Sequence, residues 1–190
     1  VPIAGLTALQ ALRDLGEIKA VKKVLINGAS GGVGTFAVQI AKAMNAVVTG
    51  VCSAKNIEFV NNLGADFVVD YAQIDFAQQT EKYDIILDAV NTKTFYECEK
   101  VLQPEGVYIS TLPSFDNLAP MFLSLLVPGK KAKIIVANAN NSDLSALREL
   151  IESGKVEPIV DRTYSLEEVA AAHAYSETGR AVGKIAIVIE

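Results

Sequence analysis

The stretch that decides the fold reads Asn27-Gly28-Ala29-Ser30-Gly31-Gly32-Val33-Gly34 and directly follows the apolar run KVLI. Four glycines fall within its last seven positions, although glycine is costly to order in a folded chain. From Val33 to Met44, apolar residues then recur at the spacing of one helix face. This order predicts a strand, a tight turn and the start of a helix, whose free N–H groups could hold a phosphate.

Short β-branched runs and longer helical patterns alternate along the rest of the chain. The single Asn-Gly pair leads into a helix and not into a hairpin, so we predict crossover connections and a parallel sheet with helices on both faces. We expect strands at 22–28, 46–52, 66–71, 83–90, 106–111, 131–138 and 184–190. We expect helices at 33–44, 56–64, 92–103 and 144–151, with a further helix after a capping box formed by Ser165 and Glu168.

Composition excludes several classes of function. The 190 residues suit one domain, and a net charge of −5 with scattered cations argues against nucleic acid as the main partner. No apolar run approaches the roughly 20 residues that a membrane helix needs. Cys52 and Cys98 show no metal-type spacing, and His173 is the single histidine, so we expect no zinc site in this chain. Two isolated thiols suit a reduced compartment, and we expect a cytoplasmic protein.

The glycine loop fits the dinucleotide fingerprint G-x-G-x-x-G at Ala29, Gly31 and Gly34, with alanine in place of the first glycine. No G-K-[ST] follows, so it is not a nucleoside triphosphate loop. A tight turn without a ligand is the alternative.

The loop also fits the G-x-x-x-G-x-G pattern of short-chain dehydrogenases, and Tyr96 and Lys100 supply a Tyr-x-x-x-Lys pair. The pattern of that class also has a serine about thirteen residues before the tyrosine. At this position the chain has Tyr83. We therefore expect Tyr96 and Lys100 to belong to an ordinary amphipathic helix.

A second class fits more of the chain. AGLTALQAL (4–12), the 24–53 segment around the loop, NLGADFVVDY (62–71), YDIILDAVN (83–91) and the 154–189 segment together resemble the medium-chain dehydrogenase/reductase superfamily. Within it, the chain is similar to the zinc-independent quinone oxidoreductase and enone reductase branch. The resemblance implies an α/β Rossmann domain over 1–190 with a doubly wound, six-stranded parallel sheet.

The same resemblance implies more of the protein than this chain. The abrupt start at Val1 suggests a nucleotide-binding fragment that an N-terminal catalytic domain would precede. Residues 1–20 would form a linking helix, and the helix and strand at 165–190 would pack on that absent domain. Zinc-dependent members place a cysteine ligand about four residues before the position of Thr7, where this chain has Ile3, which favours the zinc-independent branch.

The cofactor prediction rests on the end of the second strand. NAD-specific Rossmann domains carry an acidic residue about 20 positions past the loop, and this chain has Ser53 there, followed by Lys55. Tyr71 matches a family tyrosine that often contacts the 2′-phosphate. We therefore expect NADPH more than NADH, although Lys55 as a solvated lysine and Tyr71 as a strand cap are the alternatives.

Further contacts follow from ligand binding beyond the carboxyl ends of the strands. Asn91 and the Thr111-Leu112 pair should line the nicotinamide side, Thr7 should face the cofactor, and Lys184 resembles a lysine near the adenosine end. No residue is assigned a catalytic role. The complete expected set of cofactor-binding residues is Thr7, Ser30, Gly31, Gly32, Val33, Gly34, Ser53, Lys55, Tyr71, Asn91, Thr111, Leu112 and Lys184.

These observations predict hydride transfer from NADPH to a quinone or an α,β-unsaturated carbonyl, a small-molecule substrate bound mostly by the absent domain. Alone, this chain should bind cofactor and turn over little. The alternatives are a zinc-type alcohol dehydrogenase-like NAD(P) domain, an enoyl reductase module of a synthase, and a non-enzymatic NADPH-sensing module. We also expect a homodimer that pairs the strand at 131–138 with its copy.

Overall fold

The computed structural model describes residues 2–113, 120–122, 124 and 128–189. Its main sheet has six strands in the order β3-β2-β1-β4-β5-β6, and every pair is parallel. This order reverses direction between β1 and β4, which is the doubly wound Rossmann arrangement expected from the sequence. The strands are β1 Lys23–Asn27, β2 Val47–Cys52, β3 Phe67–Asp70, β4 Tyr83–Asp88, β5 Leu102–Ser110 and β6 Lys131–Ile134.

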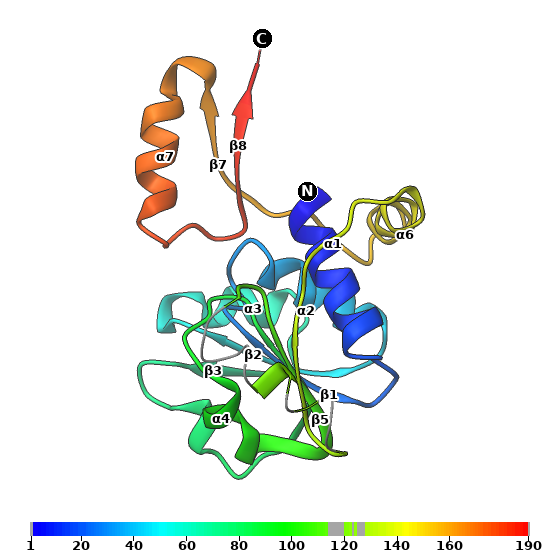
Figure 1. Ribbon diagram of the computed structural model, residues 1–190. Helices are drawn as coiled ribbons and strands as arrows, with labels where there is room; N and C mark the ends of the chain where they lie inside the picture. The colour runs from blue at the N-terminus through cyan, green and yellow to red at the C-terminus, as the bar shows by residue number, and fades with distance from the viewer. Residues whose placement is uncertain (1, 114–119, 123, 125–127, 190) are drawn as a thin grey trace.

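Helices cover both faces of this sheet, as predicted (Figure 1). One core lies beneath α1, α2, α3 and α6, and the other lies beneath α4 and its neighbouring short turns. The helices are α1 Pro2–Gln10, α2 Gly34–Ala43, α3 Ile57–Asn62, α4 Phe95–Cys98, α6 Asn141–Glu152 and α7 Val169–Glu177. A π-helical turn spans Ala11–Leu15, and 3₁₀ turns span Ala54–Asn56, Phe76–Gln78, Glu99–Val101 and Leu166–Glu168.

The helix expected over 92–103 is much shorter in the structure. Only α4 and one 3₁₀ turn form, and β5 begins at Leu102 and not at 106. Leu102 pairs with Tyr83, the register then shifts, and pairing resumes at Val107. A Cβ on Gly106 would lie 2.9 Å from the carbonyl oxygen of Tyr83, so glycine allows the close approach at this irregularity.

The sixth strand is also shorter than the expected 131–138. It ends at Ile134, and the backbone of Asn138 is bonded instead by a side chain of α1. The Gln10 amide donates to the Asn138 carbonyl at 2.7 Å and accepts from the Asn138 N–H at 2.9 Å. These two bonds satisfy the Asn138 backbone away from the sheet and turn the chain toward α6.

A separate lobe follows α6 in the sequence. It contains α7 and a two-stranded parallel sheet of β7 Val160–Ser165 and β8 Lys184–Val188, and it rises from the body of the molecule (Figure 1). The sequence predicted β8 and the Ser165–Glu168 capping box, which the structure contains, but not β7. The residues of β7 are mostly polar and none of them is buried, so no alternation marked this strand.

Within the described ranges, no helix is long and apolar enough to cross a membrane.

Candidate cofactor-binding site

The glycine loop is packed so tightly that two of its glycines have no room for a side chain. A Cβ on Gly34 would lie 2.1 Å from the Gly28 carbonyl oxygen, because the start of α2 is pressed against the loop. Gly28 has a φ of +81°, and a Cβ there would lie 2.6 Å from Val90. These close approaches fix the turn between β1 and α2 in a shape that only glycine allows.

Alanine stands at the first fingerprint position, and the neighbouring strand makes room for it. Ala29 is fully buried, and its N–H donates to the Val51 carbonyl at 2.9 Å. Its Cβ lies 3.0 Å from the place where a Cβ on Gly50 would be. Because Gly50 of β2 has no side chain, the methyl group of Ala29 fits without displacing the loop.

The loop leaves backbone donors free at the start of α2. Gly31 N–H donates to Gly28 and Thr35 N–H donates to Gly31, but the N–H groups of Gly32 and Val33 meet no acceptor in the described part of the chain. Free donors at a helix N-terminus, together with the positive end of the helix dipole, form an anion site. The residues present therefore fit the pyrophosphate of a dinucleotide.

A cavity of about 1010 Å³ opens beside this loop. It lies at the carboxyl ends of β1, β2, β3 and β4, and the lobe segment 178–181 also lines it. Dinucleotides bind in this position in doubly wound sheets. The structure brings five of the expected residues to the cavity, namely Ser30, Gly31, Ser53, Lys55 and Tyr71.

Lys184 lies against the loop. Its Nζ and Cδ atoms are each 2.9 Å from the place where a Cβ on Gly32 would be, so its ammonium group lies beside the start of α2. The adjacent Gly183 N–H donates to the Ser30 carbonyl at 2.9 Å. The lobe is therefore attached to the glycine loop directly, and it carries a cation to the start of α2.

Other expected residues lie away from the cavity. Thr7 is buried in α1, where its hydroxyl donates to the Ile3 carbonyl at 2.7 Å. Asn91, at a φ of +58°, donates to the Leu112 carbonyl at 3.3 Å and accepts from the Ser110 hydroxyl. The structure thus joins Asn91 to the Thr111-Leu112 segment at the ends of β4 and β5, beside the switch in strand order.

Two cations at the cavity were missed by the sequence analysis. Arg180 lines the cavity from the lobe, and like Lys55 it has no ion-pair partner among the described residues. Lys93 lines it from the segment after β4. Neither has a local signal, since each reaches the cavity only through the folding of distant segments.

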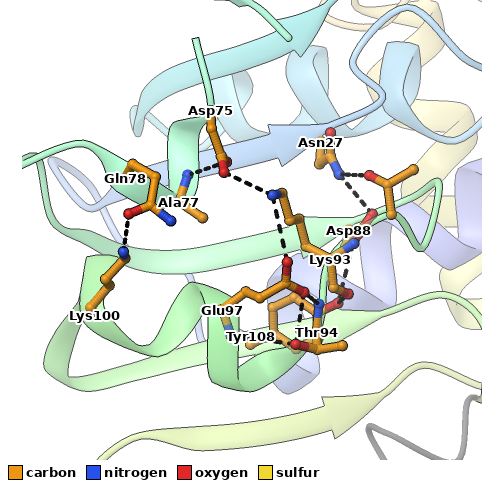
Figure 2. Close-up of polar contacts among 11 residues, drawn as sticks. Asn27, Asp75, Ala77, Gln78, Asp88, Lys93, Thr94, Glu97, Lys100 and Tyr108 are labelled. Atoms are coloured by element: carbon orange, nitrogen blue, oxygen red, sulfur yellow. Dashed lines mark hydrogen bonds and ion pairs between the residues drawn. The ribbon is translucent and has the colours of Figure 1, made fainter.

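A buried carboxylate shapes the segment after β4. Asp88 is fully buried, and it accepts from the Asn27 amide at 3.0 Å and from the Lys93 N–H at 3.2 Å (Figure 2). It also accepts from the Asn91 N–H at 2.8 Å. The Tyr108 hydroxyl donates to the Lys93 carbonyl at 2.6 Å. These bonds hold the segment that carries Lys93 in one conformation at the cavity.

The cavity holds no activated thiol. Cys52 lines it, and burial raises the pKa of this thiol to about 11, so it is protonated near neutral pH and a poor nucleophile. Tyr96 and Lys100 do not line the cavity. Among the residues that the structure describes, no three His, Cys, Asp or Glu side chains are grouped to hold a metal ion.

The fold, the glycine loop and the cavity define a class: the NAD(P)-binding Rossmann domain of an oxidoreductase of the medium-chain dehydrogenase/reductase superfamily. Comparison with protein families matches residues 63–187 to the zinc-binding dehydrogenase family. The chain belongs to this family.

Individual relatives agree with this placement. The chain is 37% identical over 199 residues to the chloroplast envelope quinone oxidoreductase homolog of Arabidopsis thaliana, covering 98% of this chain and 60% of that protein. It is 31% identical over 208 residues to the trans-enoyl reductase pgmF of Aspergillus terreus, and the match covers 100% of this chain and 58% of that protein. The solved structure of the quinone oxidoreductase of Coxiella burnetii superposes with a TM-score of 0.89 at 29% identity. This match covers 100% of this chain and 59% of that chain. The chain thus spans about 60% of the length of these relatives.

Proposed function

We propose that this chain is the cofactor-binding domain of an NADPH-dependent oxidoreductase that reduces a quinone or an α,β-unsaturated carbonyl. The observation that carries the proposal is the glycine loop. Its free N–H groups at the start of α2 and the nearby Lys184 ammonium group lie beside a cavity of dinucleotide size. When bound, the nicotinamide cofactor supplies the hydride. The chain's own part is to bind and orient this cofactor.

Preference for NADPH is supported by the charges around the cavity. Ser53 follows β2, where a carboxylate would repel a 2′-phosphate, and Lys55 and Arg180 are unpaired among the described residues. We assign Ser53, Lys55, Tyr71 and Arg180 to the adenosine 2′-phosphate, and the loop with Lys184 to the pyrophosphate. Asn91, Thr111 and Leu112 would face the nicotinamide side, and Thr7 stays a prediction as a residue that faces the cofactor from α1.

The substrate class is supported by the names of relatives, which are called quinone oxidoreductase and trans-enoyl reductase. Both names describe delivery of reducing equivalents to an electron-poor conjugated system. An enoyl reductase module of a synthase is therefore the second candidate. Assay of the whole protein with a quinone and with an enoyl thioester separates the two candidates.

The remainder of the protein is proposed to contribute most substrate contacts. We infer that an N-terminal catalytic domain packs on the lobe at residues 165–189, whose Leu166, Val188 and Ile189 are exposed apolar side chains. The whole protein would act as a homodimer. A cytoplasmic location stays a prediction, since relatives' names include chloroplast and mitochondrial proteins.

Calorimetric titration of the full chain tests the proposal. We expect NADPH to bind with a stoichiometry of one per chain and more tightly than NADH. Undetectable binding at millimolar NADPH would contradict the assignment of the glycine loop to the pyrophosphate. Tighter binding of NADH would leave the loop assignment standing and overturn the preference for NADPH.

A further inference from the structure

The cavity is also lined by residues that are not assigned to phosphate or ribose. Its apolar part is lined by Ile74 and Val90, which are 46% and 48% exposed, and by Phe76, which is 3% exposed. Large apolar side chains exposed within a cavity favour a flat apolar ligand group. Because Thr111 and Leu112 do not line this cavity, it corresponds to the adenosine half of the dinucleotide site, and this apolar end suits the base.

A polar edge borders this apolar end. Asp75 and Lys93 both line the cavity, and the Lys93 ammonium donates to the Asp75 carboxylate at 3.0 Å (Figure 2). The two residues are 18 positions apart and come from different connections, before and after β4. Their ion pair therefore joins the two segments that carry the apolar lining residues.

Both charged groups are held in place from their other sides. One oxygen of Asp75 accepts from the Ala77 N–H at 3.0 Å and caps the 3₁₀ turn there. Lys93 is fixed at its backbone by Asp88 and Tyr108, and its ammonium lies 3.6 Å from Glu97. Burial is the largest single influence on Asp75 and opposes its charge, but the hydrogen bonds from Lys93 and the Ala77 N–H, together with the nearby lysine charges, hold the pKa of this carboxyl below its ordinary value of 3.8. Both groups are charged near neutral pH.

The pair still has hydrogen-bonding capacity toward the cavity. A carboxylate offers about four acceptor positions, and the structure uses two of those on Asp75, for Ala77 and Lys93. An ammonium group has three donors, and one of those on Lys93 bonds to Asp75, while Glu97 lies 3.6 Å away, at ion-pair distance only. One acceptor face and one donor thus lie side by side at the edge of an apolar slot.

We propose that the Asp75–Lys93 pair selects a 6-aminopurine base, with Asp75 accepting from the exocyclic amino group and Lys93 donating to an adjacent ring nitrogen. This specificity role rests on the proposed binding of NADPH at the same cavity. A 6-oxopurine carries an oxygen in place of the amino group, and this oxygen would face the Asp75 carboxylate. The site would then lose one hydrogen bond to a charged group and gain a repulsive contact.

The test compares NADPH with its hypoxanthine analogue, reduced nicotinamide hypoxanthine dinucleotide phosphate, by calorimetric titration of the full chain. We expect the unmodified chain to bind NADPH about tenfold more tightly or better, the effect of one hydrogen bond to a charged group. Asp75→Asn keeps a good capping side chain for Ala77 but removes the charge. This variant should bind the two dinucleotides within about twofold of each other, and Lys93→Met should narrow the difference as well.

Lys42→Met is the matched control. Lys42 pairs with Asp66 at 2.8 Å with comparable side-chain exposure, and neither residue lines the cavity. This variant should keep the full discrimination between the two bases. Equal binding of both dinucleotides to the unmodified chain overturns the specificity role, and so does full discrimination retained in Asp75→Asn. In both cases NADPH still binds, whereas loss of all NADPH binding contradicts the proposed function itself.

Discussion

The carbonyl oxygen of Gly28 lies 2.1 Å from the place where a Cβ on Gly34 would be. The end of β1 and the start of α2 are therefore in backbone contact through the last glycine of the loop. Gly31 differs, since a Cβ there would meet only the Gly28 oxygen at 3.3 Å, and this residue lines the cavity. One glycine thus serves packing, and the other leaves space for a ligand.

We predict that Gly34→Ala and Gly31→Ala separate these two roles. Gly34→Ala forces the backbone of the loop to shift and should lower the free energy of unfolding by about 2 kcal/mol or more. Gly31→Ala should change it by less than about 1 kcal/mol and still weaken NADPH binding, because its methyl group occupies the approach to the free N–H groups. Urea unfolding and NADPH titration of both variants measure the two effects. Normal NADPH binding by Gly31→Ala would contradict the second role.

The double substitution Ser53→Asp with Lys55→Glu should reverse cofactor preference. It places carboxylates where the 2′-phosphate of NADPH would bind and leaves the 2′-hydroxyl of NADH with an acceptor. We expect the ratio of the NADPH and NADH dissociation constants to change by about tenfold or more in favour of NADH. Lys155→Glu, an exposed charge reversal outside the cavity, is the control and should leave the ratio unchanged. An unchanged ratio in the double variant would remove the argument for NADPH.

The parts of the fold that could be predicted are those with a local signal. The segment 23–43 combines a β-branched run, clustered glycines and helical spacing, and the structure contains β1, the loop and α2 there. β7 forms because Val160–Ser165 pairs with β8, and its polar sequence reflects exposure and not sheet membership. Tertiary pairing similarly starts β5 at Leu102, opposite Tyr83, in a stretch whose sequence indicated a helix.

The residues at the cavity could likewise be predicted only where they carry a local sequence signal. Ser53 and Lys55 were predictable because they follow a strand at a fixed distance from the loop. Arg180 reaches the cavity only because Gly183 binds the Ser30 carbonyl and brings the lobe over the sheet. The Asp75–Lys93 pair depends on two connections that meet around β4, and single residues of either connection carry no sign of it.

Asp88→Asn should destabilise the fold strongly. The fully buried carboxylate accepts from several donors, and the asparagine NH₂ group would replace one acceptor with a donor that faces other donors. We expect a loss of about 2–4 kcal/mol in the free energy of unfolding, measured in urea. Asp84→Asn is the control, because within the described ranges Asp84 accepts a hydrogen bond only from the Lys23 N–H, at the exposed end of β1. A loss no larger than that of Asp84→Asn would contradict the structural role of Asp88.

Protonation of the Asp143 carboxylate should lower the free energy of unfolding at acid pH. Hydrogen bonds from Asn140 and Gln10, and the ion pair with Arg13, hold the pKa of this buried carboxyl below its ordinary value of 3.8. A depressed pKa gives stability that is fully present above about pH 4 and is lost as pH falls through the folded-state value. The difference in unfolding free energy between the unmodified chain and Asp143→Asn should therefore be constant at pH 5–7 and shrink below pH 4. Urea unfolding across this range measures it.

Glu152→Gln is the control for that titration. Glu152 lies on the same helix, and its contact with Arg148 is long, at 3.7 Å, between two well-exposed side chains. Such a pair contributes little to stability, so the free energy of unfolding of this variant should match that of the unmodified chain across the range measured. A constant effect of Asp143→Asn down to pH 3 would show that the Asp143 charge does not link stability to pH.

The outer edge of β6 at Ile134 should decide oligomerisation, because the outward backbone groups of Ala132 on the same edge are already hydrogen-bonded to the Ser124 hydroxyl. The Ile135 N–H donates to the Ser110 carbonyl of β5 at 3.0 Å, so by strand alternation the Ile134 N–H points away from the sheet, toward a pairing partner. Ile134→Pro removes this outward donor while leaving the bonds to β5, and we expect the whole protein to change from dimer to monomer. Val68→Pro makes the same change on β3, the opposite edge, where the Tyr71 N–H donates inward to Cys52. Light scattering should find the Val68→Pro protein dimeric, and equal masses for both variants would contradict pairing through β6.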